Sequence, residues 1–186
     1  RWVEIWNNVF MQYFKDEAGN VTELPKKNVD TGMGVERVTA ILEGVNDNYK
    51  SSIWSDVIDL ISNISNLPYE GNEESMRIIA DHIRTCTFAL SDGAMFSNEG
   101  RGYVLRRILR RAVRYAKKIG IEKPFLFELV PTVCEVMKGY YPYLYEKKDR
   151  VMKMIKAEEE KFASTLAQGE AMLRKILGSA SGDLAG

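Results

Sequence analysis

The feature that most constrains the fold is a change in hydrophobic periodicity along the chain. Residues 2–14 are dense in aromatic and β-branched side chains, which is typical of a strand. From Ser52 onward, every periodic segment repeats at three and four residues, which is typical of helices. The sequence therefore predicts an α+β protein that is mostly α, with one domain at 1–48 and an all-helical domain at 49–186.

The first part is expected to hold a hairpin and one helix. The predicted elements are a central strand covered on both faces at 2–14, a turn at 16–20, a second strand at 21–24 and a helix at about 34–43. Pro25 is expected to end the second strand because proline lacks the N–H that a strand ladder needs. Asp30 and Thr31 are residue types that cap helix N-termini, so they are expected to start the helix.

The second part is expected to consist of five helices. They are predicted at about 53–64, 73–91, 103–119, 125–139 and 144–177. The last one carries an apolar stripe that Glu158 interrupts, and Gly178 is expected to end it as a C-cap glycine.

Composition excludes several classes of protein. Lysine plus arginine and aspartate plus glutamate both number 26, so attraction to nucleic acid must come from the arrangement of charges. Cys86 and Cys134 lack metal-ligand spacing, so they are expected to be reduced, buried thiols. No apolar run approaches the ~20 residues of a membrane span, which predicts a cytoplasmic protein without a membrane partner. The abrupt, strand-like start suggests a piece excised from a longer chain.

A glycine-rich segment between strand and helix could hold a nucleotide. Gly32 and Gly34 would let the backbone approach a base or ribose, and Arg37 follows one turn into the helix, where a guanidinium favours phosphate oxygens. The alternative is a capped surface helix with a tight entry turn. The glycine and arginine spacing alone does not separate the two.

A second candidate is the segment 101–118, which has eight basic residues and no acidic one. On a helix, its apolar side chains share one arc and its cations the opposite arc. The opposite arc contains Arg106, Arg107, Arg110, Arg111, Arg114, Lys117 and Lys118. Like charges at this spacing repel, so the face needs counter-charges, and nucleic-acid phosphates are the favoured source. The alternative is that acids elsewhere in the fold pair with it.

The loop before this helix brings Asn98 and Arg101 to its start. An asparagine amide offers both a donor and an acceptor, so Asn98 could read a base edge, although loop asparagines more often shape turns. His82 is the only histidine and has no titratable cluster around it in the sequence, so it is interpreted as structural.

Several ordered blocks of the sequence resemble alanyl-tRNA synthetases. They are Glu4-Ile-Trp-Asn, Leu24-Pro-Lys-Lys, Asp30 to Val38, Arg77 to Arg84, Ser97-Asn98, Arg101 to Arg107, and Glu158 to Leu166 with Gly169. The segment from Asp30 to Val38 is similar to motif 3 of that family. The resemblance covers nearly the whole chain.

The resemblance implies the last antiparallel strands and motif 3 helix of a class II catalytic domain, followed by a helical tRNA-recognition domain. It implies ATP-dependent activation of alanine, with Mg²⁺ accompanying ATP, and transfer to the 3′ end of alanine tRNA. Asp30 matches the carboxylate that holds the substrate ammonium, and Asn7 and Val9 match the side-chain pocket. Gly32 matches both the amino-acid and the ATP site, Gly34 the ATP site, and Arg37 the catalytic arginine on the ATP phosphates.

The same resemblance implies that acceptor-stem recognition, including a G·U wobble pair at its third position, falls to Asn98 and the basic helix. The residues that match are Asn98, Arg101, Arg106, Arg107, Arg110, Arg111 and Arg114. Motifs 1 and 2 and the editing domain, where zinc is expected, are missing, so the isolated piece is predicted to be inactive. Two other readings stay open: a non-catalytic helical RNA-binding module, and a helical scaffold for protein partners.

Overall fold

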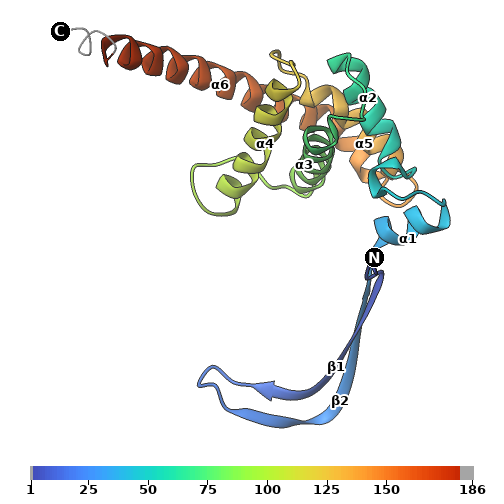
Figure 1. The fold of residues 1–186 in the computed structure, drawn as a ribbon. Helices are drawn as coiled ribbons and strands as arrows, with labels where there is room; N and C mark the ends of the chain where they lie inside the picture. Colours follow the sequence, from blue (N-terminus) through green and yellow to red (C-terminus); the bar gives the residue numbers. More distant parts are fainter. Residues whose placement is uncertain (1, 181–186) are drawn as a thin grey trace. The chain divides into compact units, whose positions relative to one another are not determined.

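The computed structural model describes residues 2–180, with side chains as far as Leu177. The chain separates into two compact units, which we call unit 1, up to Trp54, and unit 2, from Ser55 onward. Figure 1 shows both units along the chain. The division between the units follows Trp54, whereas the sequence predicted domains at 1–48 and 49–186.

Unit 1 is a hairpin followed by short helices. Strands β1 (Trp6–Lys15) and β2 (Val21–Met33) pair antiparallel, α1 spans Val35–Leu42, and a 3-10 turn, η1, spans Asn48–Lys50. The predicted turn is confirmed, since the backbone N–H and side-chain amide of Asn20 both donate to the Asp16 carboxylate, at 2.8 and 2.9 Å. These hydrogen bonds lower the pKa of Asp16.

The prediction that Pro25 ends the second strand is wrong. The register runs Met11 opposite Asn28 and then Tyr13 opposite Glu23, so Gln12 faces a bulge that contains Pro25. A bulge leaves residues outside the ladder, and a proline there loses no strand hydrogen bond. The strand therefore continues beyond the proline to Met33.

Two further expectations for unit 1 also fail. Asp30 and Thr31 lie within β2, and the N-cap of α1 is Gly34, which makes no side-chain cap hydrogen bond. In this chain by itself, every β1 side chain except the half-buried Gln12 is exposed, including Phe10 at 79%, although a strand covered on both faces was expected. The reason is that a two-stranded hairpin supplies no second layer over either face.

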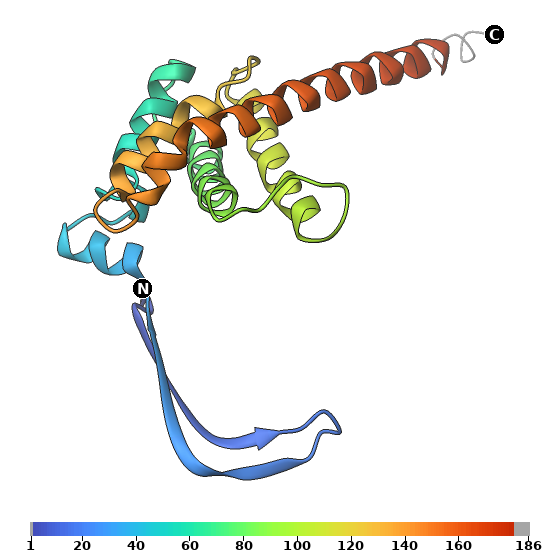
Figure 2. The same ribbon diagram turned by 180° about the vertical axis from the view of Figure 1, so that it is seen from behind.

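Between Ser55 and Ala180, unit 2 contains five helices, as predicted. They are α2 (Ser55–Ser65), α3 (Glu73–Ser91), α4 (Gly100–Lys118), α5 (Leu126–Met137) and α6 (Tyr143–Ala180). Figures 1 and 2 show α3, α4 and α5 gathered against the first half of α6. Fully buried side chains from all five of these helices form the core, among them Ile61, Ile83, Leu109, Leu129 and Ile155. None of the helices among the described residues is long and apolar enough to cross a membrane.

Helix α6 leaves the core partway along its length. Val151, Ile155 and Phe162 are buried as the apolar stripe predicted, but Leu173 and Ile176 are exposed where the helix extends past its neighbours (Figure 2). Gly178 does not end the helix, which continues to Ala180. The stripe is therefore core over only the first part of the helix.

Helix α6 also caps the start of α5. The buried carboxylate of Glu159 accepts hydrogen bonds from the backbone N–H groups of Phe125, Leu126 and Phe127 at 3.0, 3.0 and 3.2 Å. These are the N–H groups that have no partner within a helix, so a carboxylate from another helix satisfies them. Burial nevertheless raises the pKa of Glu159 to about 7, because an ionised carboxylate loses its hydration there.

Candidate functional site

Four of the predicted small-molecule site residues share one face of the β1–β2 hairpin. Asn7 lies opposite Gly32, and Val9 lies opposite Asp30, in the antiparallel register. Residues directly opposite each other point to the same face, as do residues two apart along a strand. The strand pairing thus brings together residues that are separated by more than twenty positions in the sequence.

This face is open beside Asp30 and Gly32. A Cβ at Gly32 would meet no atom within 4 Å, and the Asp30 side chain is exposed, with its Oδ1 accepting from the Thr31 N–H at 2.9 Å. On the other face, Thr31 Oγ1 accepts a hydrogen bond from the Trp6 indole N–H and donates one to Asn8 Oδ1. A ligand on the open face would therefore find a carboxylate and uncovered backbone.

Arg37 lies at the end of the same hairpin. Its guanidinium donates to the Glu4 carbonyl oxygen, and its side chain packs over Gly34, where a Cβ would lie 3.3 Å from Arg37 Cδ. Gly34 N–H also donates to the Ile5 carbonyl at 3.0 Å. Gly34 thus lets the arginine lie flat against the helix start, and the exposed guanidinium retains donors for an anion.

The basic helix α4 of unit 2 is amphipathic as predicted, but its cations are not equivalent. Acidic side chains from other helices pair with four of the seven cations of the predicted face. The pairs are Arg106 and Arg110 with Glu158, Lys117 with Glu170, and Lys118 with Glu74. The alternative that acids elsewhere neutralise this face is therefore correct for these four residues.

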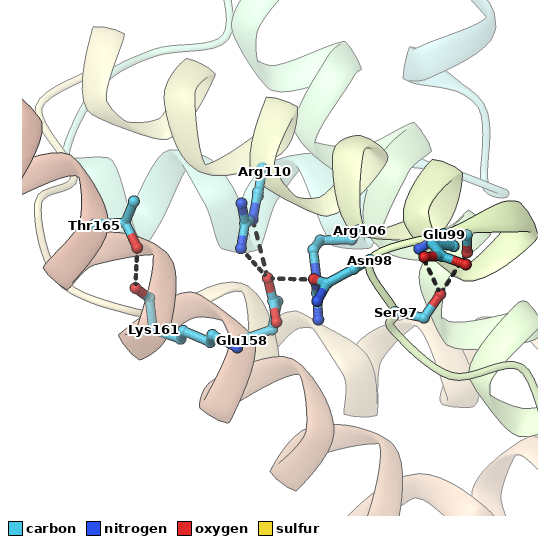
Figure 3. A network of polar contacts seen from close by, with 8 residues as sticks. All are labelled: Ser97, Asn98, Glu99, Arg106, Arg110, Glu158, Lys161 and Thr165. Atoms are coloured by element: carbon cyan, nitrogen blue, oxygen red, sulfur yellow. Dashed lines mark hydrogen bonds and ion pairs between the residues drawn. The ribbon is translucent and has the colours of Figure 1, made fainter.

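The pairs with Glu158 are the most buried, and Figure 3 shows them in close view. Glu158 is 6% exposed and its Oε1 accepts from Nε and Nη2 of Arg110 at 3.0 and 2.7 Å. Arg106, 9% exposed, brings Nε to 3.1 Å from the same oxygen without the alignment of a hydrogen bond. Arg110 also lies over the Phe162 ring, 4.8 Å from its centroid. These two arginines are structural ion-pair partners.

The remaining arginines of the predicted set are available. Arg107, Arg111 and Arg114 are exposed, and no acidic side chain among the described residues pairs with them. They line a groove with His82 of α3 and Phe162 of α6. Their spacing of four and three residues places them in one stripe along the helix. This stripe, together with the exposed Arg101 at the start of α4, is the cationic surface that could meet phosphates.

Asn98 lies in the exposed loop before α4, and its side-chain amide is held by a hydrogen bond from that helix. Its Oδ1 accepts a hydrogen bond from Arg106 Nη1 (Figure 3). The loop packs closely on α4, because a Cβ on Gly102 would collide with the Met95 carbonyl oxygen and the Ser97 hydroxyl. The structure thus joins Asn98 to the buried ion pairs, a link that the sequence-based prediction missed. The signal for it was Glu158, since a carboxylate within an apolar stripe requires a buried cation.

The other candidates act as structural groups. His82 Nδ1 lies 3.1 Å from Asp81 Oδ2, and this contact lowers the pKa of Asp81. Cys86 and Cys134 are free and buried as expected, and burial raises their pKa values to about 12 and about 11. Within the described part of the chain, no cluster of three or more His, Cys, Asp or Glu side chains could hold a metal ion.

The sequence of the chain is similar to those of known proteins. The chain is 51% identical over 184 residues to the alanine–tRNA ligase of Bacillus thuringiensis (strain Al Hakam), which covers 97% of this chain and 21% of that protein. It is 48% identical over 186 residues to the alanine–tRNA ligase of Halalkalibacterium halodurans, covering 98% and 21% of the two chains.

The chain spans about a fifth of the length of these curated relatives. The sequence model of one family, described as tRNA synthetases class II (A), matches residues 1–185. A match over nearly the entire sequence, with relatives of about 50% identity that share one name, shows the family. The chain belongs to the class II (A) tRNA synthetases.

Proposed function

We propose that this chain works within an alanine–tRNA ligase, where unit 1 contributes to the alanine and ATP site and unit 2 holds the acceptor stem of alanine tRNA. The observation that carries the proposal is the alignment of Asn7, Val9, Asp30 and Gly32 on one open face of the hairpin. The relatives are named alanine–tRNA ligases, and these residues are the ones that the resemblance assigns to alanine.

The chemistry of this site is charge neutralisation and positioning. Asp30 is the counter-charge for the ammonium group of alanine, and Asn7 and Val9 border a small side-chain pocket. Gly32 and Gly34 let ATP approach the backbone, and Arg37 neutralises phosphate oxygens as the alanine carboxylate attacks and pyrophosphate leaves. ATP enters with Mg²⁺ as a substrate. The rest of the site comes from segments of the longer enzyme outside this chain.

In unit 2, we assign tRNA backbone contacts to the exposed arginines at positions 101, 107, 111 and 114. Arg106 and Arg110 were predicted as phosphate ligands, but their guanidiniums are engaged by Glu158, so their part in RNA binding is indirect. Backbone contacts fix the position of an RNA duplex, whereas base identity needs a group aimed at a base edge. Asn98, exposed and held by Arg106, is that group.

The proposal is tested at Asn98 in the intact enzyme. In a G·U wobble pair, the guanine 2-amino group keeps a hydrogen free in the shallow minor groove of RNA, and the second lone pair of Asn98 Oδ1 can accept it. Asn98→Ala should lower aminoacylation of a G·U acceptor-stem duplex by roughly 1–3 kcal/mol in transition-state free energy, the usual value of a specific base contact.

The measurement compares kcat/KM of wild type and variant on G·U and G·C duplexes, with alanine-dependent ATP–pyrophosphate exchange as the control. Exchange should stay near the wild-type rate, because Asn98 belongs to unit 2 and the exchange chemistry to unit 1. If the variant retains the full wild-type preference for G·U, Asn98 only shapes its loop. An intact protein that binds RNA but shows no exchange would instead favour the non-catalytic RNA-binding module.

A further inference from the structure

Side chains of helix α6 hold both ends of the loop that carries Asn98. At the start of the loop, Lys147 Nζ donates to the Ser91 carbonyl oxygen at 2.8 Å. At the end of the loop, Glu158 holds Arg106, which in turn donates to Asn98. The two side chains that make these contacts, Lys147 and Glu158, belong to α6. Figure 3 shows the contact of Glu158 with Arg106.

Arg106 links the Glu158 carboxylate to the Asn98 amide. A guanidinium is planar and presents its donors in a fixed fork, so the orientation of Arg106 determines where its Nη1 hydrogen points. Arg106 is nearly buried, and its Nε lies 3.1 Å from the Glu158 carboxylate. Loss of that carboxylate would leave a buried, partly uncompensated cation free to turn toward other acceptors.

We infer that Glu158 is a positioning residue for acceptor-stem discrimination, acting through the Arg106 guanidinium to hold the Asn98 amide at the angle that reads the wobble pair. This inference rests on the proposed function, because it assigns the discrimination to Asn98. Glu158 itself does not touch RNA, since it is 6% exposed beneath the two arginines.

The chain offers a matched control in the next residue. Glu159 is also a buried carboxylate of α6, but it caps the start of α5 and accepts from the backbone of residues 125–127. Replacing either glutamate by glutamine keeps the side-chain volume and removes the charge. A general loosening of α6 would follow both substitutions, whereas reorientation of Asn98 follows only the change at Glu158.

The experiment measures kcat/KM of the intact enzyme on G·U and G·C acceptor-stem duplexes. Glu158→Gln should lower the G·U over G·C preference by about tenfold, within the range of a specific base contact. In an Asn98→Ala background, the same substitution should change the preference less than about twofold, because residues that act through one another are not additive. Glu159→Gln should keep the wild-type preference, and ATP–pyrophosphate exchange should be unchanged in all variants.

Three outcomes are decisive. If Glu158→Gln keeps the G·U over G·C preference while Asn98→Ala loses it, the inference is overturned and the proposed function stays intact. Equal losses of preference in Glu158→Gln and Glu159→Gln, or a loss that persists in the Asn98→Ala background, overturn it as well. If Asn98→Ala keeps the full wild-type preference for G·U over G·C, both the inference and the recognition role proposed for Asn98 are overturned.

If Glu158→Gln does not fold, Arg106→Lys replaces it in the same comparison. An ammonium cannot hold Glu158 and Asn98 with the fixed fork of a guanidinium, so the preference should again fall by about tenfold. A normal preference in a folded Arg106→Lys enzyme contradicts the inference.

Discussion

At the residue scale, similar side chains have different tasks because their neighbours differ. Arg110 and Arg114 are one turn apart on α4, yet Arg110 donates two hydrogen bonds to Glu158 while Arg114 is exposed on the groove. Asp30 and Glu158 are both carboxylates, but Asp30 is exposed on the open face of the hairpin and Glu158 is buried. The expected effects of substitution differ accordingly.

The substitution Asp30→Asn tests the alanine site. It keeps the shape of the side chain and removes the counter-charge of the substrate ammonium, so alanine-dependent ATP–pyrophosphate exchange should fall by about a hundredfold or more in the intact enzyme. Circular dichroism should show an unchanged fold, because the Asp30 side chain is exposed. Near-normal exchange would remove Asp30 from the substrate site.

The substitutions Arg114→Ala and Arg110→Ala should separate binding from stability. Arg114→Ala should weaken tRNA binding and lower the magnitude of the salt slope by roughly 0.7–0.9, the value of one phosphate contact. Arg110→Ala should mainly lower the free energy of unfolding, by about 1–3 kcal/mol, because Glu158 loses one of its two partners. The measurements are the salt dependence of tRNA binding and urea unfolding, each for both variants. If only Arg110→Ala changed the salt slope, Arg110 and not Arg114 would be the phosphate contact.

At the element scale, α6 organises unit 2 through polar contacts as well as apolar packing. Its first half caps α5 through Glu159, pairs with α4 through Glu158 and holds the end of α3 through Lys147. In folded proteins, most of the stability of a helix comes from tertiary packing, and these contacts supply it to the first half of α6. The contact between α6 and the start of α5 is expected to depend on pH, because burial raises the pKa of Glu159.

Glu159 should make the stability of unit 2 fall as pH rises. Its pKa is raised to about 7 in the folded protein from an ordinary value of 4.5, so the folded state binds this proton more tightly than the unfolded state. The stabilisation is fully present below pH 4.5 and is lost as pH rises through about 7, by on the order of 3 kcal/mol.

Urea unfolding at pH 5.5 and pH 8.5 measures this effect against Glu159→Gln, which does not titrate. Raising the pH from 5.5 to 8.5 should lower the free energy of unfolding of the wild type more than that of Glu159→Gln. Glu158→Gln is the matched comparison, because it removes the neighbouring carboxylate without removing the cap. An identical pH dependence in wild type and Glu159→Gln would exclude Glu159 as the titrating group.

At the scale of the whole molecule, the two candidate sites belong to different compact units. The hairpin and Arg37 lie in unit 1, and the cationic stripe and Asn98 lie in unit 2. Each unit forms its site from its own residues. Damage to one site should therefore leave the other active.

The substitution Arg37→Ala tests this separation in the intact enzyme. Loss of the guanidinium should lower ATP use in the exchange assay by at least about tenfold, since a charged contact to phosphate is lost, while tRNA affinity stays within about twofold. Filter binding of tRNA and ATP–pyrophosphate exchange are the two measurements. Equal losses in both would point to a folding defect or to a site shared by the two units.

The sequence by itself determined the features that depend on local periodicity. All five helices of unit 2, α1 and the hairpin turn were predicted, because side chains three and four residues apart fix which face a helix buries. The pairing of Asn7 with Gly32 and Val9 with Asp30 follows from the register, which the sequence alone did not specify. The site residues themselves were identified by resemblance, and their function stays a prediction.

The tertiary structure decided which charges are free and which strand residues leave the ladder. Glu158 lies 48 positions from Arg110 in the sequence, so no local pattern links them, and packing of α6 on α4 makes the pair. Likewise, Pro25 lies within the span of β2 because β2 forms a bulge there, opposite Gln12 of β1. Periodicity is a property of neighbours along the chain, whereas charge pairing and register depend on contacts between distant segments.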